Sequence, residues 1–282
     1  MCTATCNKAT AWRLELFFKT QTELQDKVIP FLRSNSVARV NLTNKTKDDK
    51  LLDSAKLLKD ALPDLDVCLH YSIKWNYVRS CERSLAALER FCEQAAQLEG
   101  CSVLLVSGGG KKRQLDTVKA LSQGKAGSAR GLHALPVHVA FNPYLPSEKE
   151  FQAEKKRLKA KLESGLVSGI YLQIGSDLQR LKEGLSFLQS AVEECMQSGA
   201  CKERPAVHGS VFLPSKRLLT QMKFRPWNGV FLSEAYLSSL PKAEAMTKEL
   251  MKIYQDFDVI PLLETAVSTA EELRKAHDLM RL

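Results

Sequence analysis

Short runs of residues with high β propensity recur along the whole chain, and the segment after each run is long enough for a helix. The eight runs cover residues 12–18, 37–43, 66–72, 102–107, 137–142, 169–173, 206–212 and 258–264. Strands that alternate with helices form parallel sheets, because a parallel connection needs a crossover of a dozen or more residues. Runs that are mostly apolar predict a sheet with both faces buried.

The segments between the runs carry helical patterns. Residues 49–60 and 78–98 place apolar side chains at helical spacing. A third segment opens with Ser147 and Glu150, which have the spacing of a capping box, and Gly165 supplies a stop.

Eight strand–helix units predict an α/β fold, namely a closed (β/α)8 barrel with parallel strands, as a single domain over residues 1–282. The length suits this fold, which typically takes about 250 residues. An open, doubly wound sheet is the alternative, but no GxGxxG motif follows the first run. We expect residues 1–10 to be a disordered tail. Residues 228–234 (NGVFLSE) suit either an extra strand or the lead-in to a helix, and we predict the lead-in because a later run at 258–264 supplies the last strand.

The composition excludes several classes of protein. Hydrophobic residues make up 44% of the chain and charged residues 26%, which is typical of a globular chain and not of a disordered one. No apolar stretch approaches the roughly 18 residues of a membrane span, and residues 1–11 lack the apolar core of a secretory signal. We therefore expect a cytoplasmic protein without a membrane partner. A homo-oligomer is compatible with the sequence.

The net charge of +9 permits an anionic partner, but the basic residues are interleaved with acidic ones, so a nucleic-acid partner is not favoured. The eight cysteines form no CxxC pair and have no histidine at zinc-finger spacing. We expect reduced thiols and no metal site.

Barrel enzymes carry their chemistry at the C-terminal ends of the strands. Applied to the predicted strands, this rule selects Glu15, Phe17, Asn41, Thr43, His70, Ser72, Ser107 to Gly110, Phe141, Asn142, Gln173, His208 to Phe212 and Glu264. No GxSxG motif, Cys–His signature or paired-carboxylate motif can be read along the chain.

Glu15 is the candidate with the most specific chemistry. It lies within the apolar run LELFF, and burial raises the pKa of a carboxyl group toward the range of a proton donor. The alternative is a salt bridge to Arg13 or to a nearby lysine. His70, at the end of VCLH, suits a general acid, a hydrogen-bond donor to a ligand, or a core histidine.

A glycine-rich segment, SGGGKKR, follows the fourth run. Successive glycines let backbone N–H groups approach an anion, and the basic residues supply charge. The segment is not a Walker A loop, because the GxxxxGK[ST] pattern is absent. It suits either a phosphate-bearing cofactor or a solvated loop.

Five segments resemble, in their order and spacing, the methylenetetrahydrofolate reductase family. LELFFKT (14–20) resembles the first-strand segment FEFFPPKT, and LHYS (69–72) resembles an HLT segment. FNPYLPSEKEFQAEKKRLKAKLESG (141–165) resembles a turn followed by a helix of the form RLKxKxxAG. YLQ (171–173) resembles a TQ pair, and HGSVFLPSKRLL (208–219) resembles a PGIxPxxS segment.

This resemblance implies a flavoprotein oxidoreductase on an FAD-binding (β/α)8 barrel. Such an enzyme passes a hydride from NAD(P)H to FAD and then to 5,10-methylenetetrahydrofolate, which gives 5-methyltetrahydrofolate. The resemblance implies that Glu15 is the catalytic acid, which assists protonation or ring opening of the folate, and that Gln173 and Phe212 bind substrate. It implies cofactor-binding roles for Asn41, His70, Ser107, Gly108, Gly109, Phe141, Glu154 and Lys161.

Departures from the family pattern favour an alternative without turnover. The LRGD-like end of the family's fourth strand is LVSGGG here, so Gly109 stands where the family has an aspartate and Ser107 where it has an arginine. Errors in positioning a substrate can lower a rate by orders of magnitude. The alternative is therefore a barrel that binds flavin or folate without redox turnover.

Overall fold

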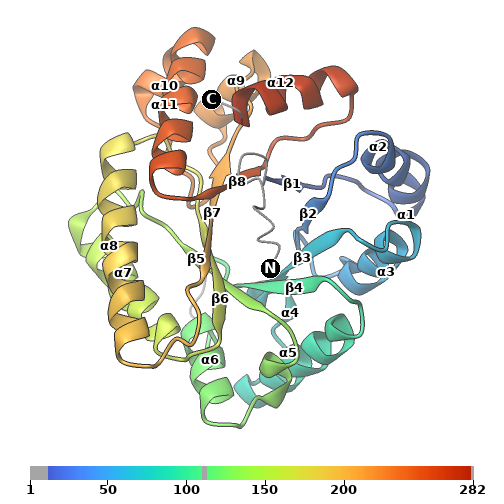
Figure 1. The fold of residues 1–282 in the computed structure, drawn as a ribbon, viewed down its shortest axis with the longest axis vertical. Coiled ribbons are helices and arrows are strands. Elements are labelled where there is room, and N and C mark those ends of the chain that lie inside the picture. The colour runs from blue at the N-terminus through green and yellow to red at the C-terminus, as the bar shows by residue number, and fades with distance from the viewer. Residues whose placement is uncertain (1–11, 110–112, 281–282) are drawn as a thin grey trace, which may run out of the picture.

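The computed structural model describes residues 12–109 and 113–280, and the tail expected at residues 1–10 lies outside these ranges. Eight parallel strands form a closed barrel with helices around its outside (Figure 1). The strands are β1 (Arg13–Glu15), β2 (Arg39–Leu42), β3 (Asp66–Ser72), β4 (Cys101–Val106), β5 (Val137–Phe141), β6 (Val167–Leu172), β7 (Ala206–Val211) and β8 (Ile260–Leu263). Each strand overlaps its predicted run, and the predicted (β/α)8 barrel is confirmed.

The barrel closes where β8 pairs with β1. Leu14 pairs with Leu263 at this seam and with Val40 on its other side. Neighbouring strands follow the chain order around the whole barrel. Because every strand pair is parallel, the C-terminal ends of all eight strands lie on one rim.

Helices connect the strands and cover the outer face of the sheet (Figure 1). They are α1 (Gln21–Glu23), the π-helical turn η2 (Leu24–Val28), α2 (Ile29–Ser34), α3 (Leu51–Ala61), α4 (Ile73–Asn76), α5 (Cys81–Ala96), α6 (Thr117–Lys125), the 3₁₀ turn η3 (Arg130–His133), α7 (Glu148–Leu162), α8 (Leu178–Gln197), α9 (Lys216–Phe224), α10 (Glu234–Ser238), α11 (Leu240–Asp256) and α12 (Ala270–Met280). The helices predicted from spacing and capping correspond to α3, α5 and α7.

The ends of α7 follow from its sequence. The Ser147 hydroxyl accepts a hydrogen bond from the backbone N–H of Glu150 and donates one to the Glu150 carboxylate. Gly165, just past the helix, adopts a φ of +73°, which residues with a Cβ rarely adopt. The predicted start and stop of this helix are confirmed.

The two faces of the sheet differ in chemistry. The outer face packs on the helices through fully buried apolar side chains such as Val40, Leu69 and Val139. Side chains alternate between the faces of a strand, and the inner face carries polar groups. These inward polar side chains include Arg13, Asn41, His70, His138, Tyr171 and His208. The sheet is buried on both faces as predicted, but its inner face is more polar than the apolar runs suggest.

Three chemical features can be stated for the described ranges. Six cysteines there are buried free thiols. No group of three or more His, Cys, Asp or Glu side chains in these ranges has the arrangement of a metal site. No helix within them combines the length and apolarity needed to cross a bilayer.

Candidate functional site

Two carboxyl groups meet at the C-terminal rim of the barrel. Glu15 ends β1 and Glu264 follows β8, so both extend from the seam at which Leu14 pairs with Leu263. Glu15 is only 7% exposed. The hydroxyl of Ser210, on β7, donates a hydrogen bond to the Glu264 carboxylate. The closure of the barrel therefore creates a carboxyl pair that no short sequence motif predicts.

The surroundings of the pair favour protonation. Burial raises the pKa of Glu15 well above its usual range, and the neighbouring Glu264 charge raises it further. Burial also raises the pKa of Glu264, to about 7, although the Ser210 hydrogen bond opposes this shift. Two carboxyl groups this close do not both ionise readily. Both groups therefore hold a proton more readily than an exposed carboxyl group does.

Lys45 is a cation beside this pair. Its ammonium lies 3.7 Å from Oε1 of Glu15 and 3.9 Å from the centroid of the Phe17 ring. The Lys45 side chain is 53% exposed, so water screens its charge and burial outweighs it in setting the Glu15 pKa. The two roles considered for Glu15 from sequence thus coexist: the residue has a lysine neighbour and still suits proton donation.

Arg13, the other partner considered for Glu15, is held in a network below the rim. Its guanidinium donates to both carboxylate oxygens of Asp66, at 2.8 and 2.9 Å. Its Nε donates to Oδ1 of Asn41 at 2.6 Å, and the Asn41 amide nitrogen lies 2.7 Å from Nε2 of His70. Because the Asn41 oxygen accepts from arginine, its amide nitrogen donates to His70. The structure brings Asn41 and His70 together as parts of this internal network.

Four rings meet inside the barrel. Tyr171 stacks on His208 with 4.3 Å between ring centroids, and His138 and His70 lie 5.6 and 6.2 Å from Tyr171. Burial lowers the pKa of His70 to about 3 and of His138 to about 4, and it lowers the pKa of His208 well below its usual value. All three imidazoles are therefore neutral at pH 7. Of the roles considered for His70, the core histidine is the best supported.

The glycine-rich segment after β4 is closed by contacts within the protein. The Ser107 hydroxyl lies 2.8 Å from the Thr117 hydroxyl and accepts a hydrogen bond from the Thr117 backbone N–H, at the start of α6. Gly108 adopts a φ of +73°, and a side chain there would collide with Lys74. The last part of the segment, at 110–112, lies outside the described residues. Within the described part, Ser107 is bound to the start of α6 and Gly108 lies against Lys74.

The loop that leads into α10 crosses the ends of β4, β5 and β6. The amide of Asn228 occupies the space that a side chain at Gly109 would need. Asn142 donates a hydrogen bond of 2.9 Å to the Gly229 carbonyl, and the same loop forms a single β-bridge with Gly175. The predicted lead-in to a helix is confirmed. Gly109 itself is exposed.

The predicted folate-binding residues lie beside this loop. Gln173 is half-buried, and its side-chain oxygen accepts a hydrogen bond from the backbone N–H of Ile174. Within the described residues, its amide nitrogen has no hydrogen-bond partner. Phe212 is buried and lies edge-on to Trp227, with 5.4 Å between ring centroids. Gln173 thus retains a group for a ligand, whereas Phe212 supports the packing of the loop.

Three predicted cofactor residues face the helix layer instead of the rim. Phe141 is fully buried, and its ring lies 6.3 Å from that of Phe187 on α8. Lys161 on α7 donates a hydrogen bond of 2.6 Å to the Ala140 carbonyl, and its ammonium lies 3.7 Å from the Glu154 carboxylate. These residues therefore lie on the helix side of the sheet, and a cofactor-binding role for them stays a prediction.

Sequence reasoning missed the contacts that join Glu15 to residues far away in the chain. Glu264 is selected by the rule on strand ends, but its partnership with Glu15 follows only from the pairing of β8 with β1. Lys45 lies in an exposed loop after β2 and carries no local signal. Ser210 is indicated only as a member of the residues that end β7.

A cleft of about 350 Å³ opens between the loop after β1 and the loop after β2, and neither Glu15 nor Glu264 lines it. Leu16 and Leu42, which directly follow or end these strands, contribute apolar walls. Lys45 also lines the cleft, so its side chain connects the cleft with Glu15.

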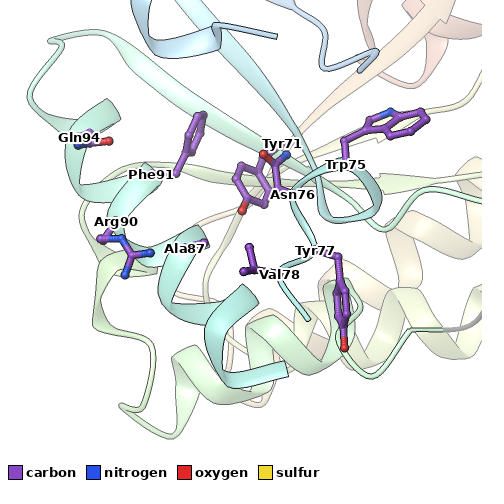
Figure 2. Close-up of a pocket in the computed structure, with 9 residues that line it drawn as sticks. All are labelled: Tyr71, Trp75, Asn76, Tyr77, Val78, Ala87, Arg90, Phe91 and Gln94. Carbon is purple, nitrogen blue, oxygen red and sulfur yellow. The ribbon is translucent and has the colours of Figure 1, made fainter. Parts of the chain in front are cut away.

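A second cleft, of about 380 Å³, lies on the outside of the barrel against α5 (Figure 2). Ala87, Arg90, Phe91 and Gln94 reach it from α5, and Tyr71 on β3 lies 4.9 Å from Phe91 between ring centroids. This cleft shares no lining residue with the first one. It is therefore a separate surface feature.

Comparisons with known proteins find similarity in structure only. No family model and no curated protein matches the sequence. An uncharacterised protein from Clostridium thermocellum that binds two copies of 5-methyl-5,6,7,8-tetrahydrofolic acid is similar over 98% of this chain and 95% of its own, with a TM-score of 0.61 and 11% identity. Active domain 2 of a chitinase from Pyrococcus furiosus is similar over 90% of this chain and 83% of its own, with a TM-score of 0.53 and 6% identity. At these identities the likeness shows the barrel fold alone.

Proposed function

We propose that this protein binds a reduced folate at the C-terminal rim of its barrel, beside Glu15 and Glu264. The observation that carries the proposal is the placement of two carboxyl groups, buried Glu15 and half-buried Glu264, on neighbouring strand ends of the rim where barrel proteins bind their ligands. Burial raises the pKa of both groups. Two further facts support folate as the ligand. The order of the sequence segments resembles a family of folate enzymes, and a protein of similar fold binds 5-methyltetrahydrofolic acid.

The pair suits the chemistry of a folate in two ways. A protonated Glu15 donates a hydrogen bond to the nitrogen-rich ring system of a bound folate. In a folate that carries a methylene bridge between two nitrogens, transfer of that proton to one bridge nitrogen opens the five-membered ring: the bond from this nitrogen to the methylene carbon breaks, its electron pair stays on this nitrogen, and the other nitrogen forms an iminium ion with the methylene carbon. Lys45, 3.7 Å from Glu15, then stabilises the carboxylate that is left.

Calorimetric titration with 5-methyltetrahydrofolate tests the proposal. We expect saturable binding to the wild type and to Glu15→Gln, because an amide still donates a hydrogen bond. Glu15→Leu should weaken binding by about tenfold, the size of one lost hydrogen bond of about 1.4 kcal/mol. Glu244→Leu, an exposed position on α11, is the matched control and should bind as the wild type does. Absence of binding to the wild type rules the proposal out.

Reduction of 5,10-methylenetetrahydrofolate by NAD(P)H through FAD is the narrower candidate. The resemblance in sequence favours it, with Glu15 at the position of the acid. Two of the residues expected to hold FAD do not fit it as they stand, because Phe141 and Lys161 face the helix layer. We therefore assign no step to a flavin.

Two measurements separate the candidates. The visible absorbance spectrum of the purified protein, before and after incubation with FAD, reports bound flavin. Oxidation of NAD(P)H in the presence of 5,10-methylenetetrahydrofolate reports turnover. Flavin bands together with folate-dependent oxidation support the reductase. Folate binding without either signal supports a binding barrel without redox turnover.

A further inference from the structure

We propose that the connection from β7 to β8 attaches this protein to an anionic lipid surface. The basic aromatic segment of this connection, residues 216–227 (KRLLTQMKFRPW), comprises α9 and the turn after it. None of the residues proposed to bind folate belongs to it. Composition predicts no membrane partner because it offers no spanning segment, but attachment to the surface of a bilayer needs no spanning helix.

The charge of the basic aromatic segment is uniformly positive. Its four basic side chains, Lys216, Arg217, Lys223 and Arg225, are all exposed. Residues 205–233 contain no Asp or Glu. Within the described ranges, none of the four cations forms an ion pair. Unpaired cations gathered on one short segment attract a surface that carries many anionic groups.

Exposed aromatic rings accompany these cations. Phe224 is 76% exposed, whereas Leu218 and Met222 on the same helix are buried. Phe224 therefore projects from the end of α9 into solvent. Trp227 lies edge-on to Phe212 and is also exposed. Apolar rings that are unfavourable in water gain a partner when they enter the boundary between lipid headgroups and acyl chains, and the neighbouring cations pair with the headgroups.

The basic aromatic segment belongs to a larger exposed surface on the C-terminal rim. Within the described ranges, the large hydrophobic side chains that are exposed all lie on connections that leave this rim, and they are Trp75, Val78, Phe224 and Trp227. Contacts link the two connections through the loop after β4. A side chain at Gly108 would meet Lys74, and one at Gly109 would meet the Asn228 amide. The ammonium of Lys74 lies 4.4 Å from the centroid of the Trp75 ring, so cation and ring are again neighbours.

A lipid surface fits this arrangement better than other anionic partners do. Single-stranded nucleic acids bind in positively charged grooves, where their bases stack on aromatic rings. Neither of the two clefts described above is lined by a residue of the basic aromatic segment, and Phe224 projects instead of lining a groove. A projecting ring between Lys223 and Arg225 suits insertion into a bilayer with anionic headgroups.

Co-sedimentation with two sets of vesicles tests the proposal, one of phosphatidylcholine alone and one that also contains about 30 mol% phosphatidylserine. We expect binding to the anionic set only, and salt should weaken it. Lys223→Gln/Arg225→Gln should weaken binding at least about tenfold, because each cation near such a surface contributes about fivefold. Lys202→Gln/Arg204→Gln removes the same Lys-x-Arg pattern from exposed positions before β7, on the opposite rim, and should bind as the wild type does.

Two substitutions of Phe224 test insertion without changing charge. Phe224→Ser should weaken binding to the anionic vesicles by about fivefold or more, because a ring that inserts contributes by leaving water. Phe224→Trp should preserve binding. The fluorescence that it adds to that of the wild type should shift to shorter wavelength when anionic vesicles are present, and an unshifted spectrum overturns insertion of this side chain.

Other outcomes also overturn the proposal. They are absence of vesicle binding, equal binding to both sets of vesicles, and an equal loss in the two double variants. Oligothymidylate and polyglutamate probe the other anionic partners in place of vesicles. If either binds, if Lys223→Gln/Arg225→Gln abolishes that binding, and if vesicles do not bind, the surface serves a nucleic acid or an acidic protein and not a lipid. A circular dichroism spectrum confirms that each variant is folded.

Discussion

Glu15 and Glu264 stand side by side although nearly the whole chain separates them, because the barrel closes by pairing β8 with β1. This arrangement affects stability as well as ligand binding. Burial raises the pKa of Glu264 from its ordinary value of 4.5 to about 7. A group with a raised folded-state pKa binds its proton more tightly in the folded protein than in the unfolded chain. Its contribution to stability is full below the unfolded pKa and is lost as the pH rises through the folded one.

Glu264→Gln should therefore gain stability relative to the wild type as the pH rises from about 5 to about 8. The shift of the Glu264 pKa sets an upper limit on the order of 3 kcal/mol for this change. Urea unfolding of both proteins at the two pH values measures it. Glu244→Gln, at an exposed site on α11, is the control, and its difference from the wild type should not vary with pH. A Glu264→Gln difference that is equal at both pH values contradicts the buried pair.

The strands were predictable because their outward side chains are β-branched or aliphatic, as Val139 and Leu69 are, and such runs leave a strong pattern in sequence. The face of the sheet to which a single side chain points is harder to predict. A shift of one position along a strand moves a side chain from the inner face to the helix layer, and Phe141 lies on the helix side. Contacts across the barrel leave no local pattern at all, which is why the partner of Glu15 emerges only from the closed ring.

The histidines inside the barrel should act on stability in the opposite direction. Burial lowers the pKa of His138 to about 4, so below pH 6.5 the unfolded chain binds a proton that the folded protein does not. The contribution of His138 is present above pH 6.5 and is lost as the pH falls toward 4. Its upper limit is on the order of 3 kcal/mol.

His138→Phe keeps an aromatic ring in the barrel and cannot titrate. Its stability relative to the wild type should rise as the pH is lowered from about 7.5 to about 4.5, as measured by urea unfolding. His277→Gln, on the outer helix α12, is the control and should show a smaller change because its ring lies outside the barrel. The stability of the wild type must be compared with that of each variant separately. The contributions of Glu264 and His138 to stability change in opposite directions over the same pH range. An unchanged His138→Phe difference contradicts a neutral, buried imidazole.

Removal of Asp66 from its ion pair with Arg13 should destabilise the protein. Arg13 is 4% exposed, so Asp66→Ala leaves a buried guanidinium without its carboxylate. We expect a loss of about 2–3 kcal/mol in the free energy of unfolding, below the usual range for buried pairs because the Asp66 side chain is 45% exposed. Asp64→Ala, two residues earlier and exposed, should cost less than about 0.5 kcal/mol. If urea unfolding gives equal losses in the free energy of unfolding for Asp66→Ala and Asp64→Ala, the ion pair does not stabilise the protein.

The contact between Gly109 and Asn228 predicts how the protein responds to Gly109→Asp, which places a side chain in the space of the Asn228 amide. Both positions are exposed and the amide is the end of a flexible side chain, so it can turn aside into solvent while the loop before α10 stays in place. We therefore expect Gly109→Asp to lower the free energy of unfolding by less than about 1 kcal/mol, and by less in an Asn228→Ala background, where the amide is gone. Thermal unfolding of the four proteins of this cycle measures the coupling, and unchanged fluorescence of Trp227 shows that the loop keeps its place. Strict additivity of the two substitutions would show that Asn228 does not occupy the place of a side chain at position 109.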